Sequence, residues 1–197
     1  MKRLGLDELP MPWARNARHV AICGWPKSGK DEVARMLEDE FNGVVVDDGA
    51  ILREALPILL GIDPMLPYSQ NGKATRVSVG DRSEQVREGL GELGNWLEDR
   101  YGPYIMPIRA MQTAQEKHPD ANFYIYPSVR KEQGRAYKMA GGVVIEVARP
   151  GVGDSGNEFD CYDRKLVDIT LTNDGTLDDL RALVKSLPLL LTDLQPS

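Results

Sequence analysis

The sequence predicts an α/β domain in three layers, a five-stranded parallel sheet flanked by helices on both faces. Three observations predict this fold class. Short apolar runs alternate along the chain with longer segments whose apolar residues recur at helical spacing. The 197 residues are enough for one buried core and short for two. A hydrophobic content of 42% and a charged content of 27% are those of an ordinary globular protein.

The elements follow in order from these patterns. The predicted strands are short, mainly apolar runs that cover 19–23, 44–46, 123–126, 143–148 and 166–171. The predicted helices cover 31–41, 50–60, 83–98, 106–116, 131–139 and the segment that follows Thr176. Thr176 has a suitable side chain for a helix N-cap. The segment 62–82 is rich in Pro, Gly, Ser and Asn, so we expect it to be a loop.

Charge and cysteine content exclude several classes of function. A formal net charge of −6 gives no general attraction to nucleic acid or to an anionic membrane, so we expect neither as a partner. The two cysteines, Cys23 and Cys161, are too far apart for a metal-ligand motif, and Cys23 lies in an apolar run that predicts a buried thiol. The N-terminal segment is too polar for a signal peptide, and no apolar run is long enough to cross a membrane. These features favour a cytoplasmic protein.

The segment around residues 24–30 has the spacing of a phosphate-binding loop. Gly24, Gly29 and Lys30 form the pattern GxxxxGK, which here follows a predicted strand and opens an amphipathic helix. Glycines let the backbone curl so that successive N–H groups point at an anion, and the helix N-terminus and Lys30 add positive charge. A chance turn is the alternative. The residues expected to contact the nucleotide are Gly24, Trp25, Pro26, Lys27, Ser28, Gly29, Lys30, Asp31 and Glu32.

Asp31 stands where such loops usually carry Ser or Thr, whose hydroxyl coordinates magnesium. A carboxylate is also an oxygen ligand that magnesium accepts, directly or through water. By chemistry alone, Asp31 is either a metal-shell residue or a helix-start residue with no catalytic part. Lys27 is likewise either a second phosphate contact or a surface lysine.

Five blocks, in order, resemble the phage deoxynucleoside monophosphate kinases, a branch of the P-loop nucleoside monophosphate kinases. They are SGKD (28–31), ILREALPILLGIDP (51–64), EQVREGLGELGNWL (84–97), PSVRKEQGRAYKMAGGVVIEVARPG (127–151) and VDITLTNDGTLDDL (167–180). In that family aspartate normally follows the loop lysine, so Asp31 resembles the residue that is usual there. The chain departs from the family at Ser128, where aspartate is usual, and at Glu32, where Thr or Ser is usual.

The resemblance implies an enzyme that transfers the γ-phosphoryl group of ATP to a deoxynucleoside monophosphate, with ATP and Mg²⁺ as cofactors. Such a reaction needs positive charge on both sides of the transferred group. The expected catalytic residues are Lys30, Arg87, Arg130 and Arg149, and a solvated surface role is the alternative for each arginine. The expected acceptor-binding residues are Asp47, Asp48, Arg53, Arg87 and Arg130. Asn173 is expected near adenine, and Asp31 at the metal.

The resemblance also implies an organisation for the chain. We expect one P-loop kinase domain over 1–197, with an acceptor-binding segment at about 47–118 and a lid at about 149–165 that is bracketed by Arg149 and Arg164. Two other functions remain open. One is a P-loop kinase that acts on a small phosphorylated metabolite or a modified base in DNA, and the other is a nucleotide-binding module without transfer activity. The sequence leaves homodimer formation and the accepted bases open.

Overall fold

The computed structural model describes residues 18–121, 123–154, 156 and 160–187. The polar N-terminal segment, which bears on the signal-peptide prediction, lies outside this part of the chain. The chain divides into two compact units. The second unit is the continuous segment Asp48–Met106, and the first is formed by the chain on either side of it. Each unit is described by itself.

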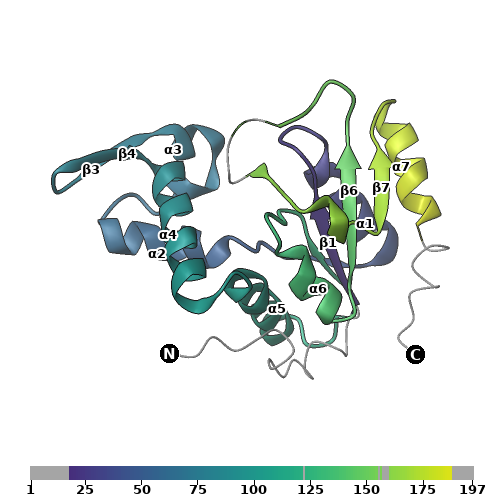
Figure 1. Cartoon of the computed structure of the whole chain (residues 1–197), viewed down its shortest axis with the longest axis horizontal. Coiled ribbons are helices and arrows are strands. Elements are labelled where there is room, and N and C mark those ends of the chain that lie inside the picture. The colour runs from purple at the N-terminus through teal and green to yellow at the C-terminus, as the bar shows by residue number, and fades with distance from the viewer. Residues whose placement is uncertain (1–17, 122, 155, 157–159, 188–197) are drawn as a thin grey trace. The chain divides into compact units, whose positions relative to one another are not determined.

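The first unit is built on a five-stranded sheet in the order β2-β5-β1-β6-β7, and every pairing in it is parallel (Figure 1). This confirms the predicted sheet. Strand β1 lies at the centre, with Val20 opposite Ile125 on one side and Val143 on the other. The strands are β1 (Arg18–Cys23), β2 (Val44–Val45), β5 (Phe123–Tyr126), β6 (Val143–Ala148) and β7 (Ile169–Thr172).

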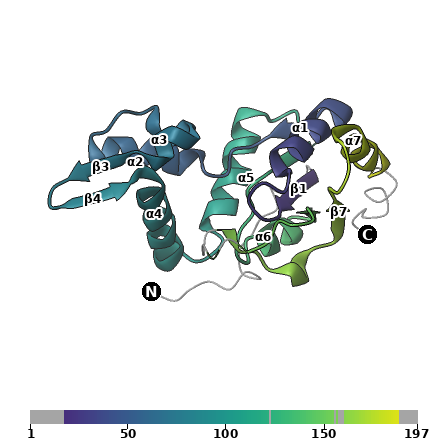
Figure 2. The same ribbon diagram turned by 90° about the horizontal axis from the view of Figure 1, so that it is seen from above.

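Helices cover both faces of this sheet, as predicted. They are α1 (Lys30–Phe41), α5 (Ile105–Lys117), α6 (Gly134–Met139) and α7 (Leu177–Ser186), with a 3₁₀ turn at Arg164–Leu166. Figure 2 shows α1 and α7 together on one face and α6 on the other. Apolar side chains of the strands pack against α1 and α7 to form the core, which includes Ile22, Leu37, Ile145 and Leu180.

Three elements of the first unit are shorter than the sequence predicts. Strand β2 ends at Val45 and not at 46. Helix α6 begins at Gly134 and not at 131, because Lys131 has a left-handed backbone (φ +45°) and pairs with Tyr162. Strand β7 begins at Ile169 and not at 166, because the preceding residues form the 3₁₀ turn. The predicted cap of α7 is confirmed, since Thr176 Oγ1 accepts the Asp179 N–H at 3.2 Å.

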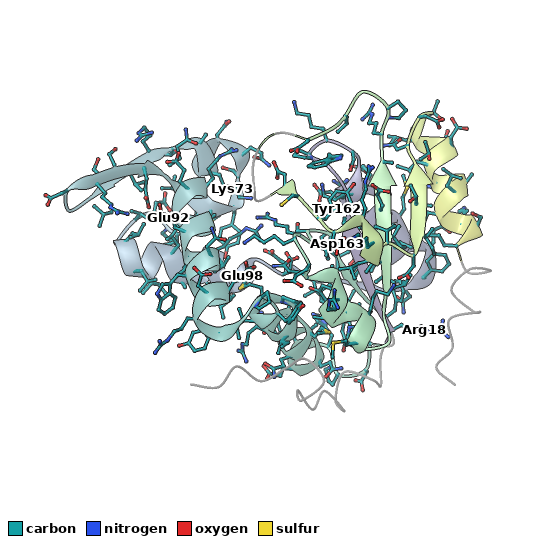
Figure 3. The ribbon with its side chains drawn as sticks, in the orientation of Figure 1. Arg18, Lys73, Glu92, Glu98, Tyr162 and Asp163 are labelled. Atoms are coloured by element: carbon teal, nitrogen blue, oxygen red, sulfur yellow. The ribbon has the colours of Figure 1, made fainter. Side chains whose placement is uncertain are left out.

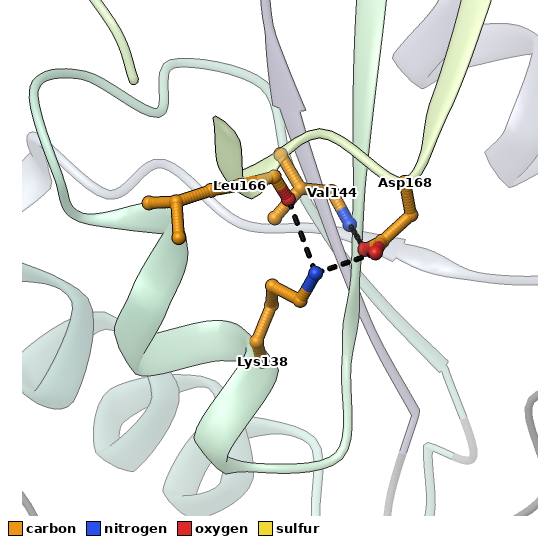
Figure 4. A network of polar contacts seen from close by, with 4 residues as sticks. All are labelled: Lys138, Val144, Leu166 and Asp168. Atoms are coloured by element: carbon orange, nitrogen blue, oxygen red, sulfur yellow. Dashed lines mark hydrogen bonds and ion pairs between the residues drawn. The ribbon is translucent and has the colours of Figure 1, made fainter. Parts of the chain in front are cut away.

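A polar clamp fixes the start of β7 to α6 and β6 (Figure 4). The Asp168 carboxylate accepts hydrogen bonds from the Lys138 ammonium at 2.5 Å and from the Val144 N–H at 2.9 Å. Lys138 also donates to the Leu166 carbonyl at 3.3 Å. The clamp lies at the edge of the sheet where β7 begins.

The second unit contains α2 (Ala50–Leu60), η3 (Leu66–Tyr68), α3 (Gln70–Ala74), the hairpin of β3 (Arg76–Val79) and β4 (Arg82–Gln85), and α4 (Val86–Tyr101). The prediction that 62–82 is a loop was therefore wrong. The alternation of Val77 and Val79, followed by a Gly80–Asp81 turn with Gly80 at φ +59°, is typical of a two-residue hairpin. The predicted helix over 83–98 starts later, at Val86, because the residues before it pair with β3.

The glycines of α4 make room for its neighbours within the second unit. A Cβ on Gly94 would lie 3.4 Å from Leu52 of α2, and one on Gly89 would lie 2.8 Å from the Glu84 carboxylate. At Gly94 the neighbour is therefore another helix of the unit, at an ordinary van der Waals distance. A pocket of about 340 Å³ lies among α2, the hairpin and α4, and its lining includes Trp96.

None of the helices in the described part of the chain combines the length and the hydropathy that a membrane crossing requires.

Candidate functional site

Five predicted site residues or segments follow the carboxyl ends of the five parallel strands. Because the strands are parallel, these ends share one edge of the sheet. The order β5-β1-β6 also makes the end of β1 a topological switch point, where open α/β sheets bind ligands. The strands β2, β1, β5, β6 and β7 are followed respectively by Asp47, the loop 24–30, Arg130, Arg149 and Asn173.

The loop 24–30 connects β1 to α1, which is the context that a phosphate-binding loop requires. Gly24 and Gly29 have φ values of +145° and +106°, in the region that favours glycine. A Cβ on Gly24 would lie 2.5 Å from the Val147 carbonyl oxygen of β6, so a side chain there would collide with backbone. The glycine pattern is therefore needed for the loop to form.

The Lys30 side chain folds back over this loop. Its ammonium donates to the Gly24 carbonyl at 2.7 Å and to the Trp25 carbonyl at 3.0 Å. Burial lowers the pKa of Lys30 below its ordinary value, and the charge of Arg130 lowers it further, whereas Asp31 and Asp160 act in the opposite direction. The loop thus holds a partly buried cation. Arg130, the predicted arginine after β5, is near enough for its charge to lower the pKa of that cation.

A buried hydroxyl inside the loop lacks a partner. Among the residues that the structure describes, Ser28 Oγ is the buried side-chain polar atom without a hydrogen bond. Buried polar groups are normally paired, so an orphan in a functional loop calls for a ligand or water. The backbone of Ser28 is held from β7, since the Asn173 amide donates to its carbonyl at 2.8 Å. Curled backbone, cation and unpaired donor together fit an anion rich in acceptor oxygens, such as a phosphate.

The acidic residues after Lys30 differ in their surroundings. Asp31 is exposed in the first turn of α1. Glu32 forms an ion pair with Arg35 at 3.0 Å, so its carboxylate is engaged one helical turn further along. Within the described ranges there is no cluster of three or more His, Cys, Asp or Glu side chains that could hold a metal ion. Asp31 as a metal-shell residue stays a prediction.

Sequence reasoning missed a polar cluster beside the loop. Glu146, on β6, is only 7% exposed and accepts hydrogen bonds from the hydroxyls of Tyr162 and, at 3.0 Å, Thr170. Arg164 forms an ion pair with the same carboxylate at 3.0 Å, which fixes the residue that was expected to end the lid. The Tyr162 ring lies 5.4 Å from the ring of Trp25 in the loop. Figure 3 labels Tyr162 and Asp163 on this segment. The available signal was a glutamate inside the apolar run VVIEVA.

The remaining predicted acceptor-binding residues belong to the second unit. Asp48 precedes α2, and the Arg53 guanidinium lies over Gly49, 3.3 Å from the place of a Cβ there. Arg87 is exposed in the first turn of α4. The structure brings Lys30, Arg130, Arg149, Asp47 and Asn173 to one edge of one sheet, whereas a role for the residues of the second unit stays a prediction.

The buried thiol next to the loop gives a test of this geometry. Burial, reinforced by Glu146, raises the pKa of Cys23 from 9.0 to about 12. Between these pH values the unfolded chain loses the thiol proton while the folded chain keeps it, so the free energy of unfolding should fall as pH rises. The slope from this group is about 1.4 kcal/mol per pH unit. We expect Cys23→Ala to remove that part of the slope in urea unfolding at pH 9 and 10.5, and an unchanged slope would contradict the assignment.

Comparison with known proteins supports the fold. No protein-family model matches the chain, and no curated protein matches its sequence. Among solved structures, a Thermus thermophilus protein aligns with a TM-score of 0.51 at 19% identity, over 92% of this chain and 100% of the other. A dephospho-CoA kinase from Campylobacter jejuni aligns with a TM-score of 0.47 at 13% identity, over 89% of this chain and 97% of the other. The likeness to the Thermus thermophilus protein indicates a shared α/β fold and carries no activity with it.

Proposed function

We propose that this protein is an ATP-dependent kinase that transfers the γ-phosphoryl group of ATP to a deoxynucleoside monophosphate and releases the diphosphate and ADP. The observation that carries the proposal is the loop 24–30, in which Lys30 covers a curled backbone and Ser28 keeps a buried, unpaired hydroxyl. The loop stands at the switch point of a parallel sheet, where a nucleotide would meet the N-terminus of α1.

The chemistry requires positioning and charge neutralisation more than a strong base, because the acceptor phosphate is already an anion. Lys30 neutralises charge on the donor side, and the loop N–H groups orient the triphosphate. Arg130 and Arg149 follow the two strands on either side of β1, and we assign to them the neutralisation of charge on the transferred group and the acceptor. Asn173, directly after β7, holds the loop through its bond to the Ser28 carbonyl, and we assign it to the adenine side of the nucleotide.

Magnesium would enter with the nucleotide. This ion is usually bound by one or two carboxylates together with substrate phosphates and water, and Asp31 supplies such a carboxylate at the start of α1. When bound, the ion supplies positive charge that polarises the phosphoryl group. Lys30 and the loop would hold the phosphates in contact with this ion.

The acceptor is the part of the proposal that depends on the family resemblance. We assign Asp47, Asp48, Arg53, Arg87 and Arg130 to acceptor binding, and the segment 149–165 to a lid over the phosphates. The end of this lid is anchored where Arg164 pairs with Glu146. The chain would act in the cytoplasm as a single P-loop kinase domain, with nucleotides as its partners.

Incubation with ATP, Mg²⁺ and a panel of deoxynucleoside monophosphates tests the proposal. We expect ADP formation that depends on one or more of these monophosphates, measured by a coupled ADP assay. ADP formation only with another phosphorylated metabolite would show that the acceptor belongs to a different chemical class. ATP binding without turnover on any acceptor would identify a nucleotide-binding module, the alternative that Ser128 in place of aspartate favours.

Replacing Arg130 by alanine should impair the acceptor side selectively. The proposal gives Arg130 the acceptor phosphate, so its loss should lower kcat/KM for the acceptor about 100-fold while the affinity for ATP changes little. Steady-state kinetics with each substrate varied in turn measure the two effects. Arg135→Ala, which removes an exposed arginine of α6, is the matched control and should retain wild-type kinetics. Equal effects of the two variants would count against Arg130 as a site residue.

A further inference from the structure

We infer that Glu146 is a positioning residue for the nucleotide site: its buried carboxylate fixes Tyr162 against Trp25 and thereby holds the loop 24–30 in its binding conformation. The inference rests on the proposed nucleotide binding at this loop. Glu146 itself is given no contact with a substrate, so its effect must pass through other side chains.

Glu146 lies directly beside the strand that carries the loop. It stands opposite Cys23, the last residue of β1 before Gly24, and is 7% exposed. A buried carboxylate is costly unless several donors satisfy it. Here three side chains do so, the hydroxyls of Tyr162 and Thr170 and the guanidinium of Arg164. Thr170 comes from β7 and the other two from the preceding segment, so one charge joins three parts of the first unit.

The backbone on either side of Tyr162 is held as well as its hydroxyl. The Lys131 N–H donates to the Cys161 carbonyl at 2.6 Å, and the Asp163 N–H donates to the Lys131 carbonyl at 2.8 Å. Tyr162 is thus fixed through its backbone to the residue after Arg130 and through its hydroxyl to Glu146. Its ring, tilted by 57°, then presents a fixed surface to the indole of Trp25. Burial raises the pKa of Tyr162 to about 12, with the bond to Glu146 adding to the shift, so the hydroxyl remains a donor.

Trp25 connects this surface to the groups that would grip the phosphates. Its carbonyl accepts the Lys30 ammonium at 3.0 Å and the Ser28 N–H at 3.1 Å. A displacement of Trp25 would therefore move the cation and the backbone of the residue with the unpaired hydroxyl together. The path Glu146, Tyr162, Trp25, Lys30 consists entirely of direct contacts within the first unit.

The test is a double-mutant cycle read as affinity for a non-hydrolysable ATP analogue. Glu146→Gln removes the charge at nearly constant volume, and we expect about a tenfold rise in Kd by calorimetry. Tyr162→Phe keeps the ring and loses the hydroxyl, and we expect a rise of about threefold to tenfold. Because Glu146 acts through Tyr162, the double variant should bind about as weakly as Glu146→Gln alone. Additive effects, or a Glu146→Gln variant that binds like the wild type, would overturn the inference.

Fluorescence reports the loop without reference to activity. In a Trp13→Phe/Trp96→Phe background, Trp25 remains as the sole tryptophan, and Glu146→Gln should make it more accessible to iodide quenching. Unchanged quenching would contradict the link to Trp25. Should Glu146→Gln fail to fold by circular dichroism, Tyr162→Phe carries the test alone, with unchanged analogue affinity as the contradicting result.

Asp168→Asn is the matched control. It also neutralises a carboxylate that joins β6 to β7, and it disrupts the clamp to Lys138 and Val144, two residues before Thr170 and Glu146 in the two strands, without touching Tyr162. We expect it to lower the unfolding temperature while analogue affinity and Trp25 quenching stay unchanged. If the wild-type protein does not bind the analogue, the proposed function fails. If it binds and Asp168→Asn matches Glu146→Gln in affinity, the inference alone fails.

Discussion

Replacing Lys30 by alanine should abolish phosphoryl transfer while the protein stays folded. The ammonium is the cation that the loop itself holds, through the carbonyls of Gly24 and Trp25 at 2.7 and 3.0 Å. Without it, the charge that develops on the transferred group loses the side-chain cation of the loop on the donor side, and we expect kcat/KM to fall by about 1,000-fold or more. The variant loses these two hydrogen bonds but also removes a partly buried charge that is costly to desolvate, so we expect the protein to stay folded.

The measurement combines the coupled ADP assay with thermal unfolding. Lys185→Ala is the control for removing a lysine from the first unit, since Lys185 forms an exposed pair with Glu40 at 3.2 Å on the surface of α7 and α1. Exposed pairs of this kind contribute about 1 kcal/mol or less, so this variant should keep its activity. An active, folded Lys30→Ala variant would show that the site has been misplaced.

Replacing Gly24 by alanine is the second change with a large expected effect. The new methyl group would lie 2.5 Å from the Val147 carbonyl oxygen and 2.8 Å from Ser28 Oγ, at a backbone φ of +145°. Side chains rarely adopt this φ, and the nearer obstacle is backbone of the central sheet, which cannot rotate away. We expect a loss of about 3 kcal/mol or more in the free energy of unfolding, together with loss of ATP binding.

Gly141→Ala separates backbone strain from steric collision as causes of the lost stability. Gly141 also has a positive φ, +81°, but a Cβ there would meet no atom within 4 Å. It should therefore cost about 1 kcal/mol from backbone strain alone and leave ATP binding intact. Urea unfolding and calorimetry with an ATP analogue measure both quantities. Equal losses of stability in the two variants would contradict the steric argument at Gly24.

The sequence predicted the first unit well because its signals are local. A parallel strand buried on both faces is a continuous apolar run, and the loop glycines, the cap at Thr176 and the amphipathic stripe of α1 each act within a few residues. Strand order is not local, but parallel strands joined by helices leave few topologies, so residues after strand ends could be assigned to one edge. Lys30 and Arg130 both follow predicted strands, but their roles in the site were expected from the family resemblance.

Other features could not be predicted in this way. The hairpin over 76–85 has only two apolar residues in its strands, so its polar composition was interpreted as loop. Glu146 and Tyr162 are 16 positions apart and meet because a segment returns to the sheet between β6 and β7. A polar contact of this range leaves no periodic trace in one sequence. Asn173 was expected near adenine, which stays a prediction, and its bond to the Ser28 carbonyl depends on side-chain geometry that the sequence does not reveal.

The second unit enters and leaves the chain as one uninterrupted stretch, 48–106, while the groups proposed to grip the triphosphate all lie outside that stretch. Under the proposed function, natural selection for a new acceptor would change residues of this segment and leave the residues that bind ATP unchanged. Chimeras that exchange only residues 48–106 between related enzymes would then show the acceptor preference of the donor of that segment. Their dependence on ATP would be that of the enzyme that receives it.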